Sequence, residues 1–261
     1  MTEPITLESL SLATDGGFVA AVDISRILEE LGVGDRHRLV GGLTVMLHVQ
    51  RLGLDLPVRA TGDADFGLTP VALREPMLVR AIEKAGYRQV AGNRWERAVD
   101  ERRTATVDLL APSYTSRPSN DVRFGAVVTS EILGLAEAFL RPAIGLHARL
   151  LLTTGEELEA RVLLPDALAS LALKCGARVS RDESRDVEDL WRCLEVAAAD
   201  GVDPAIFEQP PWAETRRRLI SEFVDPGRSL AALVGQLQPD AAARMRTRVR
   251  ALLSDVAGVS T

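Results

Sequence analysis

Cysteine and aromatic residues are both scarce in this sequence. Its 261 residues include only Cys175 and Cys193, too few for a disulfide framework or for a metal site built from cysteines. Aromatic residues make up 4% of the chain, so a hydrophobic core must consist mainly of leucine, valine and alanine. These shortages favour a protein of a reducing cytoplasm with an aliphatic core.

The sequence also lacks long apolar runs and an excess of positive charge. No stretch approaches the roughly 18 uncharged apolar residues of a membrane span, and the first ten residues lack the basic-then-apolar order of a signal peptide. We therefore expect no membrane association. The net charge of −6 argues against broad wrapping of nucleic acid.

Any nucleic acid must therefore meet a local basic surface, and one stretch qualifies. Residues 74–103 contain eight basic side chains: Arg74, Arg80, Lys84, Arg88, Arg94, Arg97, Arg102 and Arg103. Five acidic residues lie in the same stretch, so an ordinary solvated surface is an equally good interpretation.

Hydrophobic periodicity predicts an α/β first half and a mainly helical second half. We place the first domain at residues 1–125 and the second at 126–261, with a β-hairpin around Gly155 inside the second. Strands are predicted at residues 38–40, 58–68, 93–98 and 104–110. Helices are predicted at residues 24–31, after Gly41-Gly42, from Thr69-Pro70 to Gly86 with a break at Pro76, at 130–140, from Pro165, and at 182–199, 214–223, 227–237 and 239–254.

Two aspartates on one predicted strand are the most informative feature. Apolar and polar residues alternate over residues 58–68, so Asp63 and Asp65 leave the same face of the strand. Asp108, on the strand predicted at 104–110, can add a third carboxylate. Three converging carboxylates repel one another unless a cation neutralises them, and such a cluster suits Mg²⁺ (or Mn²⁺) bridging the oxygens of a nucleoside triphosphate. The alternative is a chance pair of aspartates on a solvated edge strand.

Gly41 and Gly42 lie between a predicted strand and a predicted helix, shortly before the two aspartates. Glycines at this position let the backbone approach a phosphate, and the start of the following helix offers unpaired N–H groups. A pair of glycines in a simple turn would look the same, so the position of the pair is what favours nucleotide binding.

Lys174 is a single cation on a predicted helix otherwise rich in alanine and leucine. It is either a surface lysine or one directed at an anion. On the helix at 182–199, one flank carries the aspartates Asp182, Asp186 and Asp189. Asp186 or Asp189 could position Lys174 or act as a base; the alternative is a charged outer face that pairs with arginines.

Taken in order, five stretches resemble the AbiEii-type nucleotidyltransferase family, the toxins of toxin–antitoxin and phage-defence systems that include the MenT proteins. The matching stretches are LVGGLTVMLH (39–48), RATGDADFGL (59–68), GYRQ to NRWER (86–97), TVDLLAP (106–112) and LPDALASLALKCGAR to RDVEDLW (164–191). They cover about residues 36–195. No single motif is highly specific, but their ordered set is.

The resemblance implies a polymerase-β-like nucleotidyltransferase core with a mixed sheet, an α+β arrangement, followed by a mainly helical C-terminal lobe. It implies a magnesium-dependent transferase that moves NMP from an NTP to an acceptor, in characterised relatives the 3′ end of tRNA, and that a cognate antitoxin neutralises. By position, Gly41 and Gly42 match the first motif, Asp63 and Asp65 the metal aspartates, Lys174 the later lysine, and Asp186 or Asp189 the acidic residue after it. Asp108 is added on geometry alone.

One departure concerns the first motif, because many relatives have Gly-Ser where this chain has Gly41-Gly42. Thr44, one turn into the predicted helix, is the candidate to replace the missing hydroxyl. Two other functions remain open: nucleotide transfer to a small molecule or protein, and a catalytically silent member that binds nucleotide and regulates.

Overall fold

The computed structural model describes residues 4–180 and 184–259, which form two compact units, Met1–Asp166 and Ala167–Thr261. The predicted boundary at residue 125 differs from this division. The hairpin of β9 (Ile144–Leu151) and β10 (Glu157–Leu164) pairs with β1 (Ile5–Glu8) near the N-terminus, so it belongs to the first unit. A pairing between strands so distant in sequence leaves no local signal.

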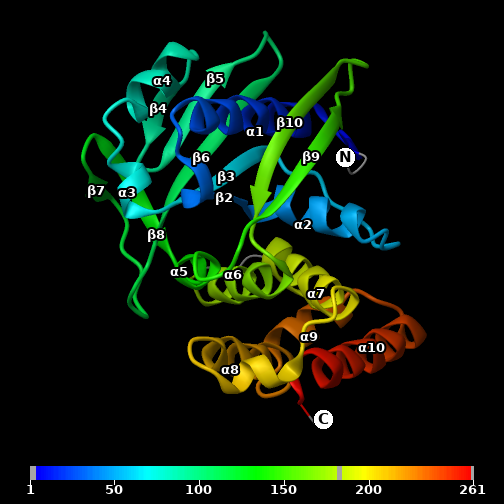
Figure 1. Cartoon of the computed structure of the whole chain (residues 1–261). Helices are drawn as coiled ribbons and strands as arrows, with labels where there is room; N and C mark the ends of the chain where they lie inside the picture. Colours follow the sequence, from blue (N-terminus) through cyan, green and yellow to red (C-terminus); the bar gives the residue numbers. More distant parts are fainter. Residues whose placement is uncertain (1–3, 181–183, 260–261) are drawn as a thin grey trace. The chain divides into compact units, whose positions relative to one another are not determined.

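The first unit is a mixed α/β structure with two sheets, which confirms the predicted class (Figure 1). Its further elements are α1 (Leu12–Glu30), β2 (His37–Val40), α2 (Gly41–Arg51), β3 (Asp63–Leu68), α3 (Pro70–Leu73), α4 (Leu78–Lys84), β4 (Arg88–Ala91), β5 (Arg94–Ala98), β6 (Thr104–Pro112), β7 (Val122–Phe124), β8 (Val127–Ile132) and α5 (Leu135–Ala138), with a 3₁₀ turn at Gly34–Arg36. The small sheet has the order β1-β9-β10.

The large sheet has the strand order β2-β3-β6-β5-β4, and β8 joins β6 and β7. The pairs β3–β6 and β6–β8 are parallel and the others are antiparallel. The sheet is therefore mixed, as the resemblance implied. It brings the two strands that carry the candidate aspartates, β3 and β6, side by side.

Helix α1 lies across one face of this sheet and packs against β3 and β6 (Figure 1). The apolar residues of the alternating strands, among them Ala64, Phe66 and Val107, are fully buried in the same core as the apolar side of α1. Because successive strand residues point to opposite faces, the aspartates between them must leave the other face. The core under α1 therefore fixes the direction of the carboxylates.

Most predicted elements of the first unit are present, but the helix predicted at 130–140 is wrong. Residues 127–132 form strand β8, and only the short α5 follows, after Gly134 with its left-handed φ of 85°. The β-branched start of this segment, Val127-Val128-Thr129, favours a strand, and Leu110 of β6 pairs with Ser130. Strands β4 and β7 were not predicted. All four residues of β4 are exposed, so its sequence does not show the alternation of apolar and polar residues that marks a half-buried strand.

The buried His37 makes the stability of the first unit depend on pH. Burial, together with the charge of Arg38, lowers the pKa of this imidazole to about 4, against the opposing effects of the Gly34 backbone and Asp35. Above the unfolded value of 6.5 both states are neutral, so the stability is complete there. As the pH falls from 6.5 towards 4, the unfolded chain binds the proton first, and the folded state loses stability.

We expect the free energy of unfolding to fall by up to about 3 kcal/mol between about pH 7 and about pH 4 for this group alone. Urea unfolding at several pH values measures the slope. His37→Gln should flatten it, whereas the control His147→Gln, at an exposed histidine of β9, should leave it as in the wild type. An unchanged slope in His37→Gln would contradict the assignment.

The second unit is helical, as predicted. It contains α6 (Ala167–Ser180), α7 (Ser184–Ala199), α8 (Trp212–Phe223), α9 (Arg228–Val234) and α10 (Pro239–Ala257), with a 3₁₀ turn at Pro204–Glu208. On α7, Val187, Leu190 and Leu194 are buried and pack this helix into the unit, whereas Trp191 is half-buried. Within residues 4–180 and 184–259, no helix is both long and apolar enough to cross a bilayer.

Candidate functional site

The central residues of the candidate site lie at directly paired positions on neighbouring strands of the large sheet. Asp65 on β3 lies opposite Asp108 on β6, and Asp108 lies opposite Arg94 on β5. On the other side of β3, Val40 at the end of β2 lies opposite Asp65. Side chains at directly opposite positions leave the same face, so the register alone brings Asp65, Asp108 and Arg94 together.

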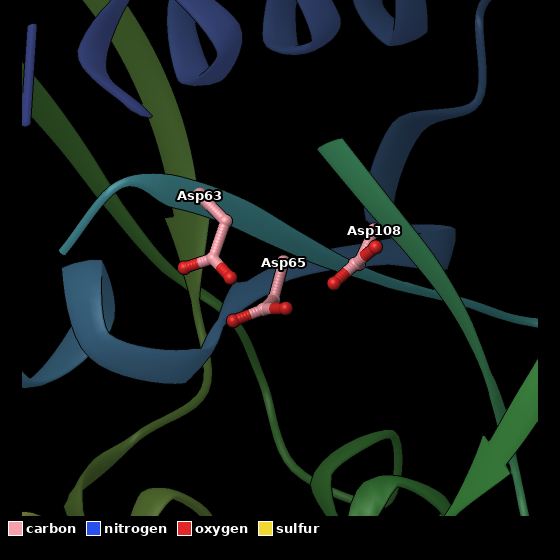
Figure 2. A group of neighbouring side chains, drawn as sticks. All are labelled: Asp63, Asp65 and Asp108. Atoms are coloured by element: carbon pink, nitrogen blue, oxygen red, sulfur yellow. The ribbon is translucent and has the colours of Figure 1, made fainter. Parts of the chain in front are cut away.

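Asp63 completes a group of three carboxylates, since it precedes Asp65 by two residues on β3. Figure 2 shows Asp63 and Asp65 leaving β3 on the same side, with Asp108 of β6 turned towards them. One oxygen from each residue lies within 4.8 Å of the others. Asp63 and Asp65 are half-buried and Asp108 is 7% exposed.

These three oxygen donors fit a hard divalent cation. Carboxylate oxygens are the ligands that Mg²⁺ and Mn²⁺ prefer, and three like charges this close are unfavourable without a counter-ion. The structure thus confirms that the three predicted residues form a cluster that could hold a metal ion.

Gly41 belongs to the site because the Asp65 carboxylate occupies the space of its missing side chain. A Cβ on Gly41 would collide with Asp65 Oδ2 and lie 2.7 Å from Asp65 Cγ. The residue also has a φ of 74°, which side chains rarely adopt. Gly41 begins helix α2, so the positive end of the helix dipole faces this carboxylate.

We therefore expect Gly41→Ala to push Asp65 out of the cluster and weaken Mn²⁺ binding by at least about tenfold. Gly53→Ala is a matched control, because Gly53 has a φ of 62° but nothing within 4 Å of an added Cβ. Both substitutions cost backbone strain, on the order of 1 kcal/mol, but only the first moves a carboxylate. Equal Mn²⁺ affinities in the two variants, measured by calorimetry, would contradict this account.

Gly42 is also confined, less tightly than Gly41, by a hydroxyl. A Cβ at this position would lie 2.8 Å from Thr61 Oγ1 and 3.2 Å from an Arg59 guanidinium nitrogen. Thr61 Oγ1 also donates a hydrogen bond to Asp63 Oδ1 at 3.2 Å. Thr61 therefore places its hydroxyl where a side chain at position 42 would begin, in agreement with the alternation over residues 58–68, which puts Thr61 on the face of Asp63 and Asp65.

Thr44 does not replace the missing hydroxyl of the first motif. Its buried Oγ1 donates to the Leu39 carbonyl at 2.6 Å, within the turn that joins β2 to α2. That expectation was wrong, because a threonine one turn into a helix tends to bond back to the preceding backbone.

Arg94 is the site residue that sequence reasoning missed. Its Nε and Nη2 donate to both oxygens of Asp108 at 3.0 and 2.7 Å, and Nη2 lies 3.5 Å from Asp63 Oδ2. The hydrogen bonds to Asp108, and then the charges of the three carboxylates, outweigh burial and hold the pKa of Arg94 above its ordinary value. In the sequence, Arg94 counts among the basic residues at 74–103 and lies within the matching stretch NRWER, but neither feature predicts a role in the site.

The rest of that basic stretch divides into two kinds of residue. Arg97 pairs with Asp23 of α1 and so links distant segments, whereas Arg103 pairs with Asp100 within one turn. The exposed members are Arg74, Arg80, Lys84, Arg88 and Arg102.

Lys174 lies in the second unit, in a buried charge cluster of its own. Its Nζ donates to Asp189 Oδ2 at 2.8 Å and lies 3.9 Å from Asp186 Oδ1. Arg192 Nη1 donates to the other Asp189 oxygen at 3.0 Å. Asp186 and Asp189 are 0% and 1% exposed, so the alternative of a charged outer face is wrong for both.

Asp189 is therefore the acidic partner of Lys174 at hydrogen-bond distance, with Asp186 next to it. Asp182, the third aspartate of the predicted flank, lies outside the described residues. The convergence of Lys174 with the carboxylates of the first unit stays a prediction.

These features were compared with known proteins at the level of sequence. The chain matches no protein-family model, and no curated protein matches it either.

Proposed function

We propose that this chain is a cytoplasmic, divalent-metal-dependent nucleotidyltransferase with a polymerase-β-like core. The observation that carries the proposal is the carboxylate triad of Asp63, Asp65 and Asp108, arranged on adjacent strands of a mixed sheet beside the glycine turn that begins α2. The ordered motifs that resemble the AbiEii-type family support the same conclusion.

Asp63, Asp65 and Asp108 would hold Mg²⁺ or Mn²⁺, and Asp108 would also help to activate the acceptor hydroxyl. A bound divalent cation would neutralise triphosphate oxygens. Gly41, Gly42 and the first N–H groups of α2 bind phosphate, which a helix N-terminus favours. The acceptor oxygen forms a bond to the α-phosphorus, the bond from that phosphorus to pyrophosphate breaks, and the acceptor proton leaves to a base or to water.

The proposed acceptor is the 3′ end of tRNA, and the proposed role is that of a toxin held in check by a cognate antitoxin. The exposed basic side chains between residues 74 and 103 suit contact with phosphates. The acidic net charge limits such contact to a local surface, as binding to one end of an RNA requires.

Incubation with each labelled NTP, Mg²⁺ and total tRNA tests the proposal. Label on the tRNA 3′ end, with release of pyrophosphate, supports it. Label on a protein or small molecule would instead establish the same reaction with another acceptor. Stabilisation by NTP and Mg²⁺ without transfer to any acceptor would indicate a silent nucleotide-binding regulator and would contradict the enzymatic proposal.

A further inference from the structure

The guanidinium of Arg94 stands at the position where the carboxylate triad needs a positive charge. Its Nη2 lies 2.7 Å from Asp108 Oδ2 and 3.5 Å from Asp63 Oδ2, so one nitrogen serves two of the three acids. A planar guanidinium that engages both oxygens of a carboxylate is the strongest form of this contact. Arg94 thus offsets part of the negative charge of the triad from within the chain.

The same contact competes with a metal ion. A divalent cation shared by Asp63 and Asp108 needs oxygens of both residues, and Arg94 engages both oxygens of Asp108 and Oδ2 of Asp63. A divalent cation and the Arg94 guanidinium repel each other strongly when both contact the same carboxylates in a partly buried site. A metal ion bound by the triad therefore weakens the bond from Arg94 to Asp108.

The side chain of Arg94 is able to leave. It is 42% exposed, whereas the side chain of Asp108 is 10% exposed. The guanidinium can therefore move into solvent, and the carboxylate cannot. Its backbone is held in β5 beside the buried Trp95, so the guanidinium stays within the length of one side chain from the site. A cation kept near the site but not tied to it is suited to bind a phosphate oxygen.

We propose that Arg94 is an internal counter-cation of the triad, which a divalent metal displaces from Asp108 and which then binds the triphosphate of the nucleotide. The first half concerns the triad alone. The second half rests on the proposed nucleotidyltransferase function.

Calorimetric titration with Mn²⁺ alone tests the displacement. Arg94→Gln removes the competing charge and should bind Mn²⁺ about tenfold more tightly than the wild type. Arg88→Gln, which removes one charge from an exposed position on the neighbouring strand β4, is the matched control and should bind like the wild type. Equal or weaker Mn²⁺ binding by Arg94→Gln would overturn the inference.

Metal-free stability supplies a second readout. In EDTA, Arg94→Gln should melt at a lower temperature than Arg88→Gln, because the three carboxylates then lack their counter-cation. Mn²⁺ should raise the melting temperature of Arg94→Gln by more than it raises that of the wild type. Arg94→Lys, which keeps the charge without the two-pronged contact, should fall between the two. Identical shifts in all four proteins would count against displacement.

Titration with inorganic tripolyphosphate in saturating Mn²⁺ tests the second role. Arg94→Gln should now bind about tenfold more weakly than the wild type, the opposite sign to its effect on the metal. A purely structural role for Arg94 would weaken both titrations together. Unchanged tripolyphosphate binding would overturn this half and leave the first.

The outcomes separate the inference from the proposed function. Tighter Mn²⁺ binding without any nucleotide transfer sustains the displacement and refutes the enzyme. Transfer that needs Asp65, with Mn²⁺ binding unaffected by Arg94, sustains the enzyme and refutes the displacement. A wild type that binds no Mn²⁺ refutes both.

Discussion

Asp65→Asn is expected to reduce nucleotide transfer by on the order of a thousandfold while leaving the metal-free protein no less stable. Asp65 is the middle residue of the cluster, paired with Val40 and Asp108 on the neighbouring strands and two residues from Asp63. The amide keeps the shape and one acceptor oxygen but removes the charge that a hard cation requires. A metal-dependent reaction should therefore be lost.

The stability expectation has its own reason. Asp63, Asp65 and Asp108 repel one another, so removing one charge relieves repulsion when no metal is bound. In EDTA the variant should melt at or above the wild-type temperature, and Mn²⁺ should stabilise it much less. Such a result separates loss of the site from loss of the fold.

The control is Asp55→Asn, which makes the same chemical change at an exposed residue outside the cluster. It should retain wild-type transfer and wild-type metal stabilisation. Label on the acceptor that survives Asp65→Asn would refute the proposed role of this carboxylate.

Asp189→Ala is expected to destabilise the second unit by about 3–5 kcal/mol. The carboxylate is 1% exposed and holds two buried cations, Lys174 at 2.8 Å and Arg192 at 3.0 Å. Its removal deprives Lys174 of its hydrogen-bonded carboxylate and leaves Arg192 with Glu188, and weakening the compensation of buried charges is among the costliest defects in a protein.

Glu188→Ala is the matched control on the same helix. Glu188 pairs with the same Arg192 at 3.0 Å, but its side chain is 52% exposed, so the loss should cost no more than about 1 kcal/mol. Urea unfolding of the two variants and the wild type measures the difference. Equal costs would mean that the buried cluster does not carry the stability assigned to it.

Local sequence was sufficient for the direction of the aspartates on β3 and for the glycine turn. Strand residues alternate between faces, so Asp63 and Asp65 had to leave opposite to the buried Ala64 and Phe66. The turn from a short apolar strand through Gly41-Gly42 into an apolar helix was predicted from hydrophobic periodicity and from the conformational freedom of glycine. These features depend on neighbours within a few residues.

The position of Arg94 in the site is a feature that local sequence patterns do not predict. Arg94 is one of eight basic residues in its stretch, and only the antiparallel pairing of β5 with β6 sets it opposite Asp108. A signal was present, because a turn over residues 99–103 between the two predicted strands brings positions 94 and 108 into register. The pairing itself, however, comes from long-range contacts.

By itself, then, the sequence determined the class of fold, the helical second half and the chemistry of the candidate residues. These depend on residue type and on the spacing of apolar residues along the chain. Tertiary structure decided the rest: the hairpin that extends the first unit to Asp166, the parallel β3–β6 register that joins Asp65 to Asp108, and the burial of Asp186 and Asp189. Each of these depends on segments distant in the chain, whose pairing is selected by the burial of a common core rather than by local preference.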